Sequence, residues 1–190
     1  IGASADPVER MRITKDGNIG IGTSAPKVPL DIHEMGGLTV GYTRLNNGGA
    51  ATNASYQITT SYAVPTSDWK ASFVAPSSGN VEIQFMCYLA TGASSAARVF
   101  LGLSTSSSYS ALSAAHEHEA WEVDEEDNCC VSHSWVLTGL TPGTSYTYYI
   151  GTKHTFGSDV LFWRYGGTNQ NLYQDLIIRT IAIPKTLTTD

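Results

Sequence analysis

The sequence predicts an all-β protein in which a short N-terminal strand segment precedes a β-sandwich. Two observations support this fold class: apolar and polar residues alternate in many short runs, and turn residues separate those runs at regular spacing. No stretch of the 190 residues keeps the 3.6-residue period of an amphipathic helix. Hydrophobic residues make up 42% of the chain, which is enough for a core.

The N-terminal segment, residues 1–33, contains two or three short strands. Met11 and Ile13 alternate with arginines, and an Asp-Gly pair then predicts a two-residue hairpin turn. Ile19 and Ile21 resume the alternation. Strands this short cannot bury a core alone in water, so we expect several chains to wind together.

The rest of the chain divides into a linker, a head and a tail. Residues 34–54 are rich in glycine and asparagine, so we expect a linker or neck with one short strand from Leu38 to Leu45. Residues 55–184 contain strand after strand, for example the strictly alternating run 81–89, and seven to nine such strands predict a sandwich or barrel. Residues 185–190 follow a proline and are expected to form a loose tail.

One specific motif lies in the N-terminal segment. It consists of Glu9-Arg10-Met11-Arg12-Ile13, Asp16-Gly17-Asn18-Ile19-Gly20-Ile21-Gly22-Thr23, Pro26 and Leu30-Asp31-Ile32. This order and spacing resemble a motif common in phage tail fibres. The resemblance implies an intertwined homotrimeric β shaft, in agreement with the expectation that the segment needs partner chains.

The head carries looser resemblances. Phe73-Val74-Ala75-Pro76 with Gly79-Asn80-Val81 resembles the entry of the jelly-roll heads that cap trimeric fibres, in complement-head and tumour-necrosis-factor-like folds. Residues 140–146 resemble a strand corner of fibronectin type III domains. We expect a jelly-roll-like head, because a fibronectin module runs to only ~100 residues and this region has about 130.

Charge and cysteine content exclude several classes of protein. Seven of the 17 acidic residues fall between Glu117 and Asp127, and no cluster of Lys and Arg marks a nucleic-acid binder. No apolar run approaches the ~20 residues of a membrane helix, and the N-terminus does not resemble a signal peptide. Cys87, Cys129 and Cys130 are expected to be reduced thiols, with Cys87 in the core, in a protein made in a host cytoplasm.

Two segments have the chemistry of metal ligands. If His116 and His118 lie on one strand, their imidazoles point the same way, and three such pairs on a trimer axis supply six nitrogens for a transition metal, similar to His-x-His iron sites of phage fibres. The alternative is a solvated or interface pair, because the parity of Trp121 and Val123 places both histidines opposite the core face. The run 124–128 has side-chain oxygens of the kind that bind calcium, but it lacks the spacing of a calcium-binding loop. This favours an exposed turn.

Aromatic and polar residues near the C-terminus are the candidate receptor-binding residues. Flat rings provide stacking faces and Asn and Arg side chains provide directional hydrogen bonds, a combination suited to sugars. The candidates are Trp163, Arg164, Tyr165, Asn169, Asn171 and Tyr173. The alternative for Trp163 is a place in the core, where Trp135 is also expected.

The motifs of common enzymes are absent from the sequence, since it contains no nucleophile elbow and no phosphate-binding glycine loop. We therefore expect a non-enzymatic tail fibre tip of a virion, which binds a surface glycan or envelope receptor of a bacterium and contacts other tail proteins. The alternative is a structural connector or trimerisation knob with receptor binding elsewhere. A depolymerase tailspike is disfavoured, because its usual long parallel β-helix has no counterpart here.

Overall fold

The computed structural model describes residues 9–32, 37–49, 53–91, 97–123, 128–155, 161–167 and 173–185. This part of the chain is all-β, as predicted, and contains no α-helix. The strands are β1 (Met11–Ile13), β2 (Ile19–Ile21), β3 (Leu30–Ile32), β4 (Thr39–Leu45), β5 (Ala54–Gln57), β6 (Lys70–Val74), β7 (Val81–Thr91), β8 (Ala97–Ser104), β9 (Glu117–Val123), β10 (Cys129–Leu137), β11 (Ser145–Thr155), β12 (Leu161–Tyr165) and β13 (Leu176–Ala182). There are two short 3₁₀ turns: η1 (Asn47–Gly49) follows β4, and η2 (Ala114–His116) precedes β9.

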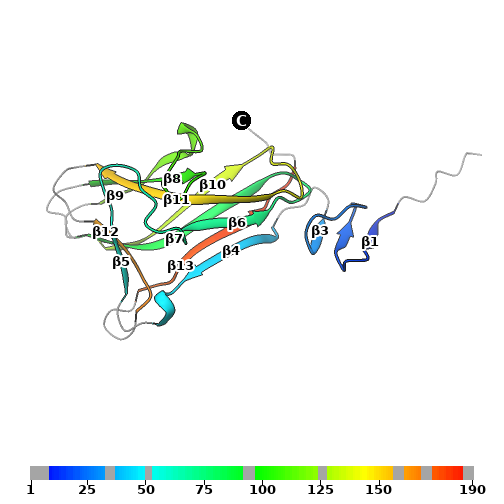
Figure 1. Cartoon of the computed structure of the whole chain (residues 1–190), viewed down its shortest axis with the longest axis horizontal. Helices are drawn as coiled ribbons and strands as arrows, with labels where there is room; N and C mark the ends of the chain where they lie inside the picture. The colour runs from blue at the N-terminus through cyan, green and yellow to red at the C-terminus, as the bar shows by residue number, and fades with distance from the viewer. Residues whose placement is uncertain are drawn as a thin grey trace, which may run out of the picture.

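The strands form one small sheet and two larger ones (Figure 1). In the small sheet, β2 pairs with β1 antiparallel and with β3 parallel. The second sheet has the order β6-β11-β8-β9 and is antiparallel. The third is also antiparallel and is built around β7. Figure 1 shows the small sheet beyond one end of the two larger ones, which together form the sandwich-like head.

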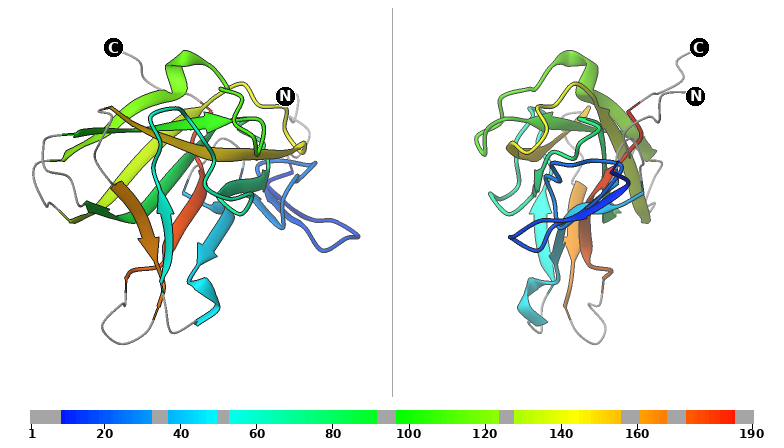
Figure 2. Two further views of the ribbon diagram at one scale, coloured as in Figure 1. Left: turned by 60° about the vertical axis from the view of Figure 1, so that its left-hand side comes forward. Right: turned by 90° about the vertical axis from the view of Figure 1, so that its right-hand side faces the viewer.

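The length of β7 causes the third sheet to curl. One edge of β7 pairs with β10 over its first nine residues. Along the other edge, the first half of β7 pairs with β13 and the second half with β12. β4 continues the sheet beside β13, and β5 continues it beside β12, so two arms extend from the same edge of β7 (Figure 2).

The segment 34–54, expected to be a linker, contributes a strand to the head. β4 pairs with β13 over six residues, from Leu45 opposite Leu176 to Thr39 opposite Ile181. The hydroxyl of Thr43 also donates a hydrogen bond to the carbonyl of Lys70 on β6, at 2.8 Å. The expected short strand therefore exists, and it forms the edge at which the two large sheets meet. Its glycines and asparagines lie mainly at the two ends, where the chain turns.

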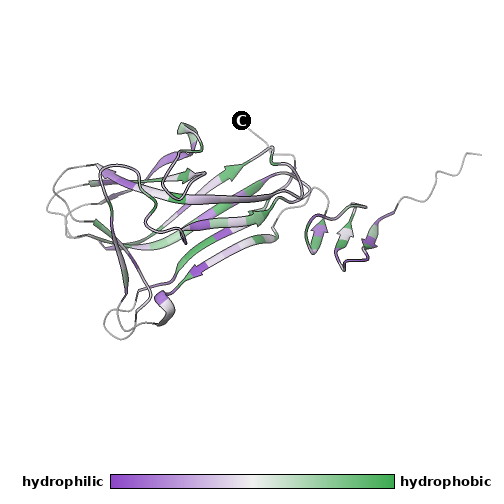
Figure 3. Ribbon diagram, viewed as in Figure 1, coloured by the Kyte–Doolittle hydropathy of each residue, from purple (hydrophilic) through white to green (hydrophobic). Residues whose placement is uncertain are grey.

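The predicted period-two residues form the core of the head. Inward-facing side chains from both large sheets make one continuous cluster. Figure 3 marks the hydrophobic residues along these strands in green. Fully or almost fully buried members are Val81, Ile83, Phe85, Cys87, Leu89, Val99, Leu101, Leu103, Val131 and Trp135. The predictions for Cys87 and Trp135 are thus confirmed, and burial raises the pKa of the Cys87 thiol.

The small sheet is attached to the head through a buried carboxylate. Asp31 on β3 is only 2% exposed. Its two oxygens accept hydrogen bonds from the backbone N–H of Lys27, at 2.9 Å, and from the hydroxyl of Ser77 in the β6–β7 turn, at 2.6 Å. Because a buried carboxylate is costly without such donors, this arrangement ties β3 to the head.

The hairpin predicted between β1 and β2 is present, but its loop is longer than two residues. Ile13 pairs with Ile19, and between them the N–H of Thr14 donates to the carbonyl of Asn18 at 2.8 Å. Gly17 provides the left-handed turn residue, with φ 84°. On β2, a Cβ at Gly20 would lie 2.4 Å from the carbonyl oxygen of Thr23, so this motif position requires glycine.

Candidate functional site

One face of the small sheet is entirely apolar and largely exposed. The register places Met11, Ile21 and Ile32 in one row across the three strands and Ile13, Ile19 and Leu30 in the next, and directly opposed residues share a face. The exposed fractions are 57% for Met11, 66% for Ile13, 41% for Ile21 and 38% for Leu30. We call these six side chains the shaft face.

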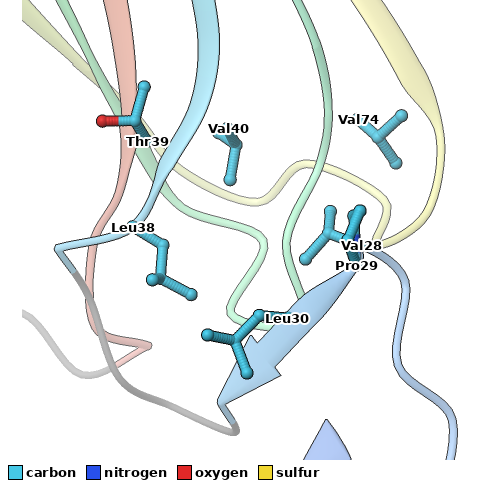
Figure 4. Close-up of a pocket in the computed structure, with 7 residues that line it drawn as sticks. All are labelled: Val28, Pro29, Leu30, Leu38, Thr39, Val40 and Val74. Carbon is cyan, nitrogen blue, oxygen red and sulfur yellow. The ribbon is translucent and has the colours of Figure 1, made fainter. Parts of the chain in front are cut away.

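An apolar pocket joins the shaft face to the head (Figure 4). It has a volume of about 410 Å³ and shares Leu30 with the shaft face. Its walls come from the end of the small sheet, the start of β4 and the end of β6, namely Val28, Pro29, Leu30, Leu38, Thr39, Val40 and Val74. The uncovered apolar surface therefore continues from the small sheet onto the head.

The outer face of the third sheet also exposes apolar side chains. Tyr42 on β4 is 56% exposed, Met86 on β7 is 38% exposed and Val136 on β10 is 52% exposed. Tyr42 and Met86 line a pocket of about 240 Å³, and beside them Arg179 donates two hydrogen bonds to the amide oxygen of Gln84, at 3.1 and 2.6 Å. This face mixes apolar side chains with hydrogen-bonded polar groups.

The candidate receptor residues on β12 split between the two faces of the sheet. Trp163 is 0% exposed and Tyr165 only 5%, so neither ring offers a stacking face to a receptor. The indole of Trp163 packs edge-on against Phe85 and donates to the hydroxyl of Thr152, at 3.1 Å. Trp163 therefore lies in the core, as the alternative interpretation expected.

Arg164 and Tyr173 lie together on the opposite face. The guanidinium of Arg164 donates to the hydroxyl of Tyr173 at 3.0 Å, and Tyr173 contacts the ring of Tyr88 with 4.8 Å between centroids. All three side chains are half-buried. The other two candidates, Asn169 and Asn171, lie outside the described residues, as does most of the acidic run 124–128.

A polar pocket lies where β4 and β12 end, on the opposite side of the head from the small sheet (Figures 1 and 2). Its volume is about 310 Å³. Hydrogen-bonding groups form most of its wall, and the lining residues are Arg44, Leu45, Asn46, Asn47, Gly48, Tyr56, Asp68 and Tyr165. We call it the tip pocket. The prediction missed its residues on β4 and β5, since they are brought together only by strand pairing.

Local contacts hold the wall of the tip pocket in place. Arg44 pairs with Asp175, and the side-chain oxygen of Asn46 accepts the N–H of Gly48 at 3.0 Å. At the end of β12, a Cβ on Gly166 would lie 2.2 Å from the carbonyl oxygen of Asn46, so the close approach of the two strand ends requires glycine there. Tyr56 stacks on Tyr165, with ring centroids 6.0 Å apart.

The tip pocket combines hydrogen-bond donors and acceptors with aromatic walls. The guanidinium of Arg44 can donate, the carboxylate of Asp68 can accept, and both side chains are exposed. Tyr56 adds a half-buried ring. A ligand with many hydroxyl groups on an apolar ring frame, such as a saccharide, presents the complementary set of groups.

The two predicted metal ligands do not point to a common site. His116 ends the turn η2 instead of lying on a strand, and its Nδ1 is 2.7 Å from the hydroxyl of Ser113. His118 lies on β9 opposite the core residue Leu101, so it faces inward. The predicted outward orientation of His118 is wrong, because an irregularity in the β8–β9 pairing, next to Ala120, changes the parity of the strand.

His118 instead meets His133 of β10. The Nδ1 atom of His118 is 2.8 Å from the Nε2 atom of His133, and both rings pack near Trp135. Burial lowers the pKa of His133 to about 4, and the neighbouring His118 acts in the same direction. In the part of the chain that the structure describes, no group of three or more His, Cys, Asp or Glu side chains is placed to hold a metal ion.

Among the described residues, no helix has the length and apolar character required to cross a membrane. No protein-family model and no curated protein matches this chain.

Proposed function

We propose that the protein is the distal part of a trimeric phage tail fibre, with the small sheet as the end of its shaft and the head as its receptor-binding tip. The observation that carries the proposal is the shaft face. A sheet of three three-residue strands that exposes four large apolar side chains gains too little burial to be stable in water alone. Partner chains that cover this face would supply the missing apolar burial.

Three copies around an axis suit the geometry of the shaft face. Each copy contributes one flat apolar face, and three such faces enclose a triangular core with the polar residues outside. The neighbouring apolar pocket and the outer face of the third sheet extend the surface that copies of the head can share. Exposed apolar surface of this extent is typical of interaction sites.

The strand order supports a jelly-roll-like head. Apart from β5 and β12, the eight strands of the two large sheets pair as nested hairpins: β4 with β13, β6 with β11, β7 with β10, and β8 with β9. A long antiparallel hairpin of four strand pairs, rolled into two sheets, has the jelly-roll connectivity. The expected resemblance to capping heads of trimeric fibres is consistent with this order.

The tip pocket is the proposed receptor-binding site, and a surface saccharide is the proposed receptor. The pocket lies on the opposite side of the head from the small sheet, which supports a role as the receptor-facing end if the small sheet ends a shaft. Three pockets per trimer turn weak single contacts into firm attachment, since the second and third contacts become intramolecular. Arg164 lies on β12 next to the tip-pocket residue Tyr165 and is hydrogen-bonded to Tyr173, so these two residues are secondary candidates for receptor binding.

Assembly is tested by light scattering on the purified chain. We expect a trimer, and we expect Ile13→Lys to dissociate it, because each chain loses about 1.5–3 kcal/mol of apolar burial and buries a charge instead. Ser24→Lys adds the same single positive charge at an exposed position between β2 and β3 and is the matched control. A wild-type monomer at micromolar concentration would contradict the trimer.

Receptor binding is tested with whole bacteria and a glycan array. Asp68→Ala and Arg44→Ala should each weaken binding by about tenfold or more, since a polar ligand loses a charge-assisted hydrogen bond in each case. Arg98→Ala, which removes an equally exposed arginine from β8, should bind normally. If both pocket variants bind like the wild type, the tip pocket is not the receptor site. A wild-type trimer that binds no cell surface would favour the connector role.

A further inference from the structure

The fold brings two imidazole rings together at the seam between the two large sheets. His118 comes from β9, the last strand of the sheet β6-β11-β8-β9, and His133 comes from β10 in the sheet built around β7. The Nδ1 atom of His118 and the Nε2 atom of His133 face each other at 2.8 Å. Imidazole nitrogens from two different sheets therefore lie within hydrogen-bonding distance of each other.

A backbone carbonyl orients the imidazole of His118. Its Nε2 atom lies 2.8 Å from the carbonyl oxygen of Ala115, which can only accept a hydrogen bond. Nε2 therefore carries a proton, and Nδ1 presents its lone pair to the N–H of His133 Nε2. A metal ion takes the place of this shared proton, which leaves to Nδ1 of His133 or to water. A carbonyl that holds the far nitrogen of a histidine is the usual way in which proteins orient a metal-binding imidazole.

Trp135 forms a fixed wall against the ring of His133. Trp135, which is 1% exposed, packs edge-on against His133 with 4.7 Å between ring centroids. The indole N–H of Trp135 donates to the carbonyl of His116 at 3.0 Å, which fixes this wall. Both histidines are half-buried, so water can reach the site.

We propose that His118 and His133 bind a divalent transition-metal ion such as Zn²⁺, Ni²⁺ or Cu²⁺, which links the two sheets of the head. Imidazole nitrogen is a preferred ligand of all three ions. Metal–nitrogen bonds of about 2.1 Å at a tetrahedral angle require the two nitrogens to separate by about 0.6 Å and each lone pair to turn by roughly 35° from the line between them, so both rings reorient when the ion binds. Water occupies the remaining positions, because the described residues place no third protein ligand there.

This site differs from the axial site predicted from His116 and His118. Each chain supplies both of its own ligands, so a trimer holds three separate ions and the site does not depend on assembly. The ion binds only where the two strands are held together, so it stabilises the folded head. It closes the edge of the sandwich opposite the one that β4 closes.

The test is zinc binding by the untagged full chain after treatment with EDTA. Isothermal titration with ZnCl₂ should give one ion per chain, and a Zn²⁺ concentration ten times Kd should raise Tm by about 3 °C. His118→Gln and His133→Asn keep a hydrogen-bonding group without the imidazole, and each should abolish both effects. Magnesium ions, which prefer oxygen ligands, should not raise Tm.

Two controls separate this site from other zinc ligands. His116→Ala should bind zinc like the wild type, and so should the double variant Cys129→Ser/Cys130→Ser. In the wild type, the imidazole ¹⁵N signals of His118 and His133 should shift on addition of zinc, whereas those of His154 should not. The absence of binding by the wild type, unchanged binding by His118→Gln, or loss of binding in the cysteine variant would each overturn the proposal.

Discussion

In the small sheet β1–β3, Met11 and Ile13 expose 57% and 66% of their surfaces, whereas Phe85 and Trp163 in the head expose none. Both regions are built from strands with the same alternation of apolar and polar residues. The head has a second sheet to cover its apolar face, and the described residues of the chain provide no such layer for the small sheet. The difference shows that alternation determines which face of a strand is apolar, while the number of packed layers decides whether that face is buried.

The largest expected effect on stability is in the buried core of the head. Trp163→Ala should lower the free energy of unfolding of the head by about 3–5 kcal/mol, because it leaves a cavity between Phe85 and Trp69 and removes the hydrogen bond to Thr152. Urea unfolding followed by circular dichroism measures it. Trp121→Ala is the matched control, since Trp121 is 43% exposed, and should cost less than about 1 kcal/mol. Equal losses for the two tryptophans would show that the core is not where the structure places it.

An intermediate effect is expected at the joint between the two regions. Asp31→Ala should destabilise the docking of β3 on the head by about 1–3 kcal/mol, because the N–H of Lys27 and the hydroxyl of Ser77 lose their acceptor. Hydrogen exchange of the β2 and β3 amides should become faster while that of β7 amides is unchanged. Asp31→Asn, which can still accept from Lys27 and donate to Ser77, should restore most of the protection. Uniform acceleration throughout the head would instead indicate a global role for Asp31.

The smallest effect is expected at the tip pocket. Arg44→Ala removes an exposed ion pair with Asp175, and such pairs contribute about 0.2–1 kcal/mol. The free energy of unfolding should therefore change by less than about 1 kcal/mol, although binding to cells falls. A larger loss of stability would mean that the reduced binding reflects damage to the head and that the variant says nothing about a receptor contact.

The pattern of the sequence predicts the fold class well and the sites less well. The alternation from Val81 to Leu89 identifies a core strand, and the burial of all its odd-numbered residues confirms the prediction. On β12 the same alternation applies, so Trp163 and Tyr165 must share a face. Only the pairing of β12 with β7, which places Trp163 opposite the core residue Leu89, shows that this face is the inner one. The shortness of β1–β3 predicts a need for partner chains, which the exposed shaft face supports and does not test.

The sequence by itself determined the all-β class, the hairpin between β1 and β2, and the apolar faces of the main strands, because these depend on residues close together in the chain. Only the tertiary structure decided that β4 belongs to the head, that His118 turns inward to meet His133, and that Arg44 and Tyr165 line one pocket. Each of these results from pairing between segments far apart in sequence or from a local change of register. A periodic pattern carries no information about either.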